Sequence, residues 1–275
     1  MKKILSTLCI GGMMWIANAQ NSFQFNQVLQ PNSTYTMSMK TDNAMQMELI
    51  TAEELPAELK KMEMLQSTAI STKTETQGKD ATGAVPYVLT YTYMDVSTTM
   101  NGQKSTSLEW NEDNDLKKIK IHGKDTNGNR VITSVEGPEA IRKSLEVIFD
   151  GIQSYLNLPK DVFHLNEAKV ISGEMKIPVE NALIPITLKT TYTFRGIEDG
   201  KAKFDLMINS DFISNQISGF DFSVKQYEIK GELFIDTANH NIINAVYEGP
   251  VRMLMTKDDL KINLSSDMKI VIQSK

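Results

Sequence analysis

Residues 184–208 read IPITLKTTYTFRGIEDGKAKFDLMI, and apolar side chains occupy most even positions on both sides of a central turn. The turn is Glu198-Asp199-Gly200, whose residue types suit a tight chain reversal. A period of two places successive side chains on opposite faces of a β-strand. The stretch therefore predicts two antiparallel strands, with one face toward a core and the other toward water.

The same alternation extends through much of the chain. It recurs in residues 35–49, 87–93 and 262–272, where every second position is mostly apolar. Within the first of these segments we interpret Asp42-Asn43 as the turn of a hairpin. Continuous apolar runs, which are typical of buried parallel strands, are absent after the first nineteen residues. The fold class predicted is mainly β, with a long-stranded antiparallel curved sheet or half-barrel.

Local signals predict where the strands turn and where one is irregular. Asn101-Gly102, Asn127-Gly128 and residues 237–241 contain the residue types that adopt positive φ in tight turns. Between Val224 and Tyr227 the apolar phase slips by one position. A slip of this kind within a strand predicts a β-bulge.

One segment has helical rather than strand periodicity. Residues 138–156 carry apolar side chains at helical spacing, after Gly137-Pro138 and before Pro159. A weaker helix is expected from Thr51, with Met62 on its apolar side. We therefore expect a single β-rich domain over residues 20–275, packed on one central amphipathic helix near 138–156, so that the α+β character is minor.

The first nineteen residues have the three parts of a secretory signal peptide. Lys2 and Lys3 form the basic region, residues 4–16 the apolar region, and Ala17-Asn18-Ala19 the cleavage box. The apolar run is too short to span a bilayer of about 30 Å. We expect cleavage after Ala19, a periplasmic or secreted location, and no transmembrane anchor.

Removal of residues 1–19 also changes the chemistry of the chain. It takes away the only cysteine, Cys9, and therefore every thiol. It also removes two of 29 basic residues against 34 acidic ones, which leaves a net charge of −7. A mildly acidic chain without a basic cluster argues against nucleic acid as a partner.

Metal-binding and catalytic patterns are weak. The three histidines, His122, His164 and His240, have no second ligand at metal-binding spacing. Four residues match positions of a calcium loop: Asp125, Asn127, Asn129 and Glu136. The position that must be glycine is Arg130, so we favour a polar hairpin turn. No nucleophile motif is present, and we expect no metal, no cofactor and no enzymatic activity.

Methionine is the unusual component of the composition. Thirteen of the sixteen methionines follow residue 19. Several have strand spacing: Met37, Met39, Met45, Met47, Met253 and Met255. Flexible thioethers can line a cavity for variable apolar ligands, and they can equally fill a core. A copper-binding array is a third reading, although no histidine or cysteine lies close in sequence.

Several of these segments are similar to segments of a known protein family. The chain is similar to a family of exported bacterial β-rich proteins of unknown function. The likeness rests on the strand Thr34–Met39, the turn at Met100–Gly102, Val135-Glu136-Gly137 before the helix, and the strand Gly231–Asp236 with its turn at Asn239. The architecture also resembles the half-barrel of periplasmic lipoprotein carriers of the LolA type. The resemblance implies no functional residues.

The first functional hypothesis is an exported envelope protein that binds an apolar ligand, a lipid or another exported protein. The ligand would lie between sheet and helix, in a cavity rimmed by Met37, Met47, Tyr91 and Phe149. The alternative is a structural or assembly module that binds partner proteins through exposed strand edges. The third is a hydrolase whose acid–base pair is not visible in the sequence.

The leader yields the first testable prediction. The mature protein isolated from its native host should begin at Gln20, because signal peptidase accepts the small residues at Ala17 and Ala19. Intact-mass analysis measures this directly. A mass that includes residues 1–19, or a lipid on Cys9, would contradict the prediction.

Overall fold

The computed structural model describes residues 21–51, 56, 60–108, 115–139, 160–179, 182–211, 216–217 and 220–275. These residues form long strands and one short 3-10 helix, η1. The elements of the first half are β1 (Ser22–Gln24), β2 (Thr34–Ile50), β3 (Lys61–Thr76), β4 (Val85–Met100), β5 (Gln103–Leu108), η1 (Asp115–Lys118), β6 (Lys120–Thr126) and β7 (Asn129–Glu136). Those of the second half are β8 (Val162–His164), β9 (Ala168–Val179), β10 (Ala182–Glu198), β11 (Lys201–Asp211), β12 (Gln216–Ile217), β13 (Phe220–Asp236), β14 (Ile242–Lys257) and β15 (Leu260–Ser274).

The main sheet is antiparallel throughout the described strands. Its order is β7-β6-β4-β3-β2-β15-β14-β13-β11-β10-β9, with β5 beside β4 and β12 beside β13. Each half of the chain forms a meander, and the two meanders meet where β2 pairs with β15. The strands β7 and β9 end the order, so the sheet formed by the described residues is open. The predicted mainly β, antiparallel fold is confirmed.

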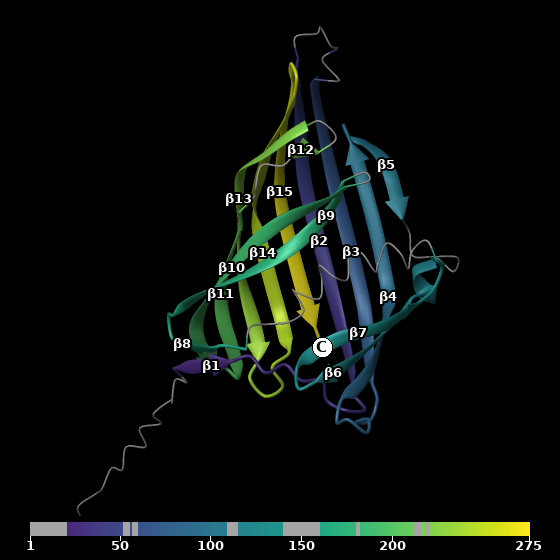
Figure 1. Cartoon of the computed structure of the whole chain (residues 1–275), viewed down its shortest axis with the longest axis vertical. Helices are drawn as coiled ribbons and strands as arrows, with labels where there is room; N and C mark the ends of the chain where they lie inside the picture. Colours follow the sequence, from purple (N-terminus) through teal and green to yellow (C-terminus); the bar gives the residue numbers. More distant parts are fainter. Residues whose placement is uncertain are drawn as a thin grey trace, which may run out of the picture.

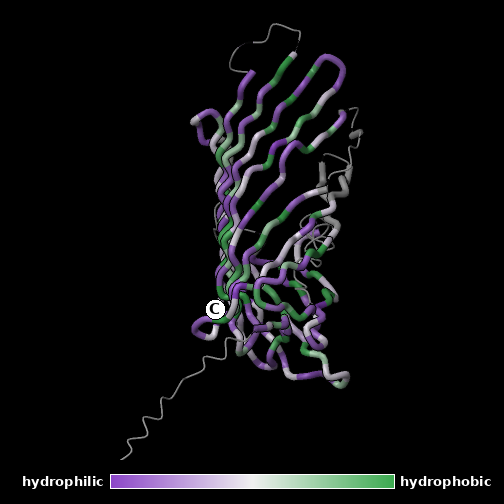
Figure 2. The backbone as a smooth tube through the Cα atoms, turned by 90° about the vertical axis from the view of Figure 1, so that its left-hand side faces the viewer, coloured by the Kyte–Doolittle hydropathy of each residue, from purple (hydrophilic) through white to green (hydrophobic). Residues whose placement is uncertain are grey.

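The sheet is strongly curled. In Figure 1, β9 and β10 cross in front of β2 and β15, and β6 and β7 cross at the lower end. In a flat sheet β7 and β13 would lie about 34 Å apart, at ~4.8 Å per strand. Yet Arg130 of β7 and Asp236 of β13 line the same pocket, so the two wings approach each other. Figure 2 shows hydrophilic and hydrophobic residues alternating along the long strands.

An aromatic core lies on the concave side of the curl. Phe23, Phe25 and Phe163, from β1, the residue after it, and β8, pack on Phe194 and Phe204 of the main sheet. The Phe204 ring lies 4.9 Å from that of Phe25 and 5.3 Å from that of Phe163. The small β1–β8 ladder therefore covers the lower part of β10, β11, β13 and β14 with apolar side chains.

Several local predictions are confirmed. The register between β13 and β14 shifts between Val224 and Gln226, which is the predicted bulge. Asn101, Asn127 and His240 have φ values of 47°, 52° and 57°, as the predicted turns require. Residues 184–208 form most of β10 and the start of β11, and Glu198 pairs with Lys201 across the predicted turn.

Two local predictions are wrong. No hairpin occurs at Asp42-Asn43, because β2 runs unbroken through both residues. The odd positions remain apolar on both sides of the pair, so the alternation itself continues without a turn. Met62, expected on a helix, instead lies in β3 opposite Met47.

The predicted helices fall largely outside the described residues. Of the helix near 138–156, the structure describes only Pro138 and Glu139. Residues 52–55 and 57–59 of the weaker helix and the leader, residues 1–19, also lie outside it. Within the described residues, no helix has the length and apolar character needed to cross a membrane.

The aromatic core generates the second prediction. Phe204→Ala should lower the free energy of unfolding by about 3–5 kcal/mol, because it opens a cavity among four other rings. Phe234→Ala is the matched control: Phe234 is half-buried on the opposite face, where Lys203 Nζ lies 5.5 Å from its ring. Urea unfolding measures both. Equal losses would show that the ring cluster is not the main core.

Candidate functional site

One face of the main sheet is apolar, and register defines it. The odd positions of β2 from Tyr35 to Leu49 share this face, which we call the apolar face. Cross-strand pairing aligns Met37 with Thr72 of β3 and Ser274 of β15, and Thr72 with Tyr91 of β4. Because directly paired residues point to the same side, the pairing extends the apolar face over all four strands.

Charge is confined to the other face of these strands. In β2, for example, Lys40, Asp42 and Glu48 occupy even positions. The registers of β3, β4 and β15 place their charged side chains beside these even positions. Over the described residues of these four strands, the apolar face therefore carries no charged side chain. We call the opposite side the charged face.

The structure places three of the predicted ligand-binding residues on the apolar face. Met37 and Tyr91 lie in one cross-strand row, two strands apart or about 10 Å. Met47 lies ten residues further along β2, which corresponds to about 33 Å. The three therefore share a long surface rather than one compact cavity. Phe149 lies outside the described residues.

A pocket of about 430 Å³ opens at the lower end of the apolar face. Tyr35 and Met37 of β2 line it together with Tyr87 and Leu89 of β4 and Ile242 of β14. Leu29 and Tyr87 at its wall are buried, whereas Met37 is half-buried. The exposed surface of the pocket is mostly apolar, and the charged residues Arg130, Asp236 and Lys275 also line it.

Residues 25–30, which we call the basal segment, close this end. The backbone amide of Asn26 donates to His240 Nδ1 at 3.3 Å, and Gln27 Nε2 donates to Asn241 Oδ1 at 3.4 Å. On the other wing, the amide of Leu29 donates to Asp125 Oδ2 at 3.0 Å. The basal segment thereby links the β13–β14 turn to the β6–β7 hairpin.

Asp125 is the buried anchor of that hairpin. Its carboxylate accepts hydrogen bonds from the amides of Leu29 and Gly128 and lies 3.5 Å from Arg130 Nε. These partners come from the protein, and Glu136 pairs instead with His122 at 3.0 Å. Asn127 and Gly128 form the turn of the β6–β7 hairpin, as predicted for this segment. Among the described residues, no group of three His, Cys, Asp or Glu side chains could hold a metal ion.

The upper half of the apolar face is rich in methionine. Met45, Met64 and Met100 form one cross-strand row, and Met47 and Met62 form the next. Beyond β15, Met253 and Met255 of β14 pair with Leu264 and Ile262. The sequence reasoning identified the strand-spaced methionines of β2 and β14, but it missed this gathering, because the register between distant strands is not visible in a single sequence.

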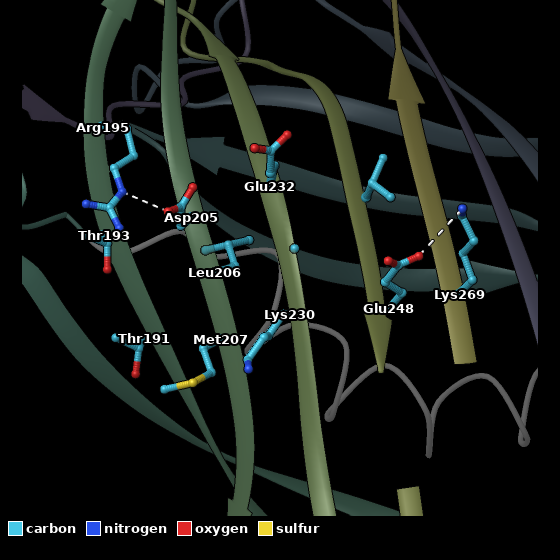
Figure 3. A pocket seen from close by; sticks show the side chains of 12 residues that line it. Thr191, Thr193, Arg195, Asp205, Leu206, Met207, Lys230, Glu232, Glu248 and Lys269 are labelled. Carbon is cyan, nitrogen blue, oxygen red and sulfur yellow. Dashed lines mark hydrogen bonds and ion pairs between the residues drawn. The ribbon is translucent and has the colours of Figure 1, made fainter. Parts of the chain in front are cut away.

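The charged face carries a shallow hollow of about 790 Å³, drawn in Figure 3. Arg195 Nε donates to Asp205 Oδ2 at 2.7 Å, and Lys203 pairs with Glu232, which raises the pKa of Lys203. Asp205 and Glu232 lie directly opposite each other on β11 and β13. Each of these carboxylates is matched by a cation and open to solvent, an arrangement typical of a solvated sheet surface.

Six of the described tyrosines lie on the apolar side: Tyr35, Tyr87, Tyr91, Tyr192, Tyr227 and Tyr247. Burial raises the pKa of Tyr91, Tyr192 and Tyr227, and it raises the pKa of Tyr247 to about 12. Tyr247 pairs with Gly231, and a side-chain carbon at Gly231 would lie only 3.0 Å from the Tyr247 ring. A side chain at Gly231 would also clash with the backbone oxygen of Val246, so glycine is needed where Tyr247 approaches β13.

Alkaline pH should therefore weaken the fold through Tyr247. The unfolded phenol loses its proton near pH 10, whereas the folded one keeps it until about pH 12. The stabilisation is complete below pH 10 and declines between these values by about 1.4 kcal/mol per pH unit. Urea unfolding from pH 9 to 11 should show a shallower decline for Tyr247→Phe than for the native chain. If the free energy of unfolding fell equally with pH in the two proteins, the raised pKa of Tyr247 would be contradicted.

Comparisons with known proteins give only distant likenesses. No protein-family model matches the chain, and no curated protein matches it. Among solved structures, "Lipid-protein interactions in lipovitellin" has a TM-score of 0.47 at 11% identity, over 90% of this chain and 26% of that one. A botulinum neurotoxin serotype C1 binding domain has a TM-score of 0.11 at 11% identity, over 88% of this chain and 79% of that one. This chain therefore spans about a quarter of the lipovitellin chain, and TM-scores this low support no inference about function.

Proposed function

We propose that this chain is an exported, non-catalytic protein that binds an elongated apolar ligand, such as a lipid, along its apolar face. One observation carries the proposal. The charged side chains of β2, β3, β4 and β15 all lie on one face, which leaves the other face of these four strands without a charged side chain and mostly apolar.

The exposure of that face supports a ligand. Met37, Met39, Met45 and Met47 are each only half-buried, whereas the core phenylalanines below are fully buried. Complete burial of such a side chain contributes about 1.5–3 kcal/mol. A ligand that covers several of them gains enough to offset the cost of its own immobilisation.

The size and the residue types of the site also support binding of an apolar ligand. The pocket of about 430 Å³ lies within the range of small-molecule sites, roughly 300–1,000 Å³. Methionine side chains adapt to ligands of varied shape. The methionine rows above the pocket extend the same apolar surface toward Leu49, which suits a ligand longer than the pocket itself.

Export and the lack of catalysis complete the proposal. The leader supports delivery to the periplasm or the exterior, where the ligand would be encountered. Among the described residues, the carboxylates Asp205 and Glu232 face each other across β11 and β13. Their cationic partners Arg195 and Lys203 favour a structural role for them.

A second candidate function is attachment of a partner protein to a strand edge. Among the described strands, β9 pairs only with β10, and its Val170 is 60% exposed. An unpaired edge with an exposed apolar side chain can accept another strand.

Paired substitutions at neighbouring positions test the ligand proposal. Met47→Glu puts a carboxylate on the apolar face, whereas Gln46→Glu puts the same group on the charged face one residue away. Met47→Glu should weaken binding of the neutral dye Nile red at least tenfold, and Gln46→Glu should leave it within twofold. Native mass spectrometry of protein purified without detergent should show bound lipid, and less of it in Met47→Glu.

Thermal unfolding of both variants separates binding from folding. Equal dye binding by two folded variants would contradict the site. A native chain that binds no dye and carries no lipid would overturn the ligand proposal and favour attachment at the β9 edge.

A further inference from the structure

A band of neutral polar side chains crosses the apolar face at mid-height. Asn43, Gln66 and Thr98 form one cross-strand row on β2, β3 and β4, and Thr41 and Thr68 form the next. Ser266 of β15 lies beside them, opposite Met45. We call these six residues the polar belt.

The polar belt lies between two apolar regions. The methionine rows of Met45 and Met47 lie above it, and the row of Met39, Ile70 and Met94 lies below it. From Asn43, β2 continues for six residues to Leu49 and for eight to Tyr35, about 20 Å and about 26 Å. Each apolar region is therefore long enough for an extended hydrocarbon segment.

The belt residues offer hydrogen bonds without charge. Ser266, which is 4% exposed, donates its hydroxyl to Asn43 Oδ1 at 2.5 Å. Because this bond engages the amide oxygen, the amide N–H groups are the donors that Asn43 can offer a ligand. Gln66 and the threonines add neutral donors and acceptors beside it.

Two kinds of apolar ligand are disfavoured by this arrangement. A pure hydrocarbon would cover the side-chain amides of Asn43 and Gln66 and offer them no hydrogen bond, which is unfavourable. An ionised head group next to the polar belt would find no opposite charge on this face of β2, β3, β4 and β15 and would lose its hydration, because the cations Arg130 and Lys275 lie at the pocket, at the lower end of the face.

We infer that the ligand is a neutral amphiphile, in which uncharged ester, amide or hydroxyl groups lie next to the polar belt and hydrocarbon segments lie on the apolar regions beside it. This inference rests on the proposed function and narrows its ligand class. It makes the belt the part of the site that selects between lipids, while the methionines supply general apolar contact.

Displacement of Nile red from the full mature chain tests the inference. The probes are monopalmitoylglycerol, which is neutral, palmitate at pH 8, which is ionised, and hexadecane, each below its aggregation limit. For the native chain, monopalmitoylglycerol should displace the dye at a concentration at least tenfold lower than either of the others. The double variant Asn43→Leu/Gln66→Leu should reduce this preference to less than threefold while it still binds the dye.

A matched control removes polar groups from the other face of the same two strands. Ser38 and Ser71 are paired across β2 and β3 on the charged face, with their hydroxyls 2.9 Å apart. Ser38→Ala/Ser71→Ala should keep the full preference. If the leucine variant does not fold, Thr41→Val/Thr68→Val, which preserves side-chain shape, should show a partial loss of preference.

The outcomes separate the two proposals. Equal or tighter binding of palmitate, or an unchanged preference in a folded belt variant, overturns the inference and leaves the apolar site in place. A native chain that does not bind Nile red at all overturns the proposed function, and the inference with it.

Discussion

The pairing of β2 with β15 holds the molecule together. It joins the first long strand of the chain to the last one, in unbroken register from Met37 opposite Ser274 to Ile50 opposite Lys261. On either side of this ladder the sheet is a simple meander of neighbouring strands, so every other long-strand contact is comparatively local. Without it the two meanders would be separate sheets, and the apolar face would be divided between β2 and β15.

That register also decides the chemistry of the two faces. A shift of one residue would turn every side chain of β15 to the opposite side. In the observed register Lys269 lies between Glu248 and Asp42, so charges of opposite sign alternate across three strands. Such exposed pairs contribute little to stability individually. Their larger effect is to keep one side of the sheet hydrated, which leaves the other side available for apolar contacts.

The sequence predicts the parts of this structure that depend on near neighbours. Alternation at Ile184–Ile208 is visible in β10 and β11 because it is a property of each strand alone, and the bulge after Val224 follows from the same pattern. The prediction fails at Asp42-Asn43. These residue types are common in turns, but the apolar alternation continues through them, and the strand does not turn. For the site, alternation alone could put Met37 and Met47 on one face. The row Met45–Met64–Met100 and the polar belt depend on pairing between strands far apart in the chain, which no local pattern specifies.

The position of β15 at the end of the sequence affects how the chain folds. A chain made from its N-terminus forms β2, β3 and β4 long before β15 exists, so one edge of β2 must wait for a partner more than 200 residues away. Contacts of such high sequence separation fold slowly, and an unpaired edge invites association with other chains. The last fifteen residues of the sheet thus act as the closing step of assembly. Truncation at the C-terminus would leave two incomplete meanders that are prone to aggregate, rather than a slightly smaller protein.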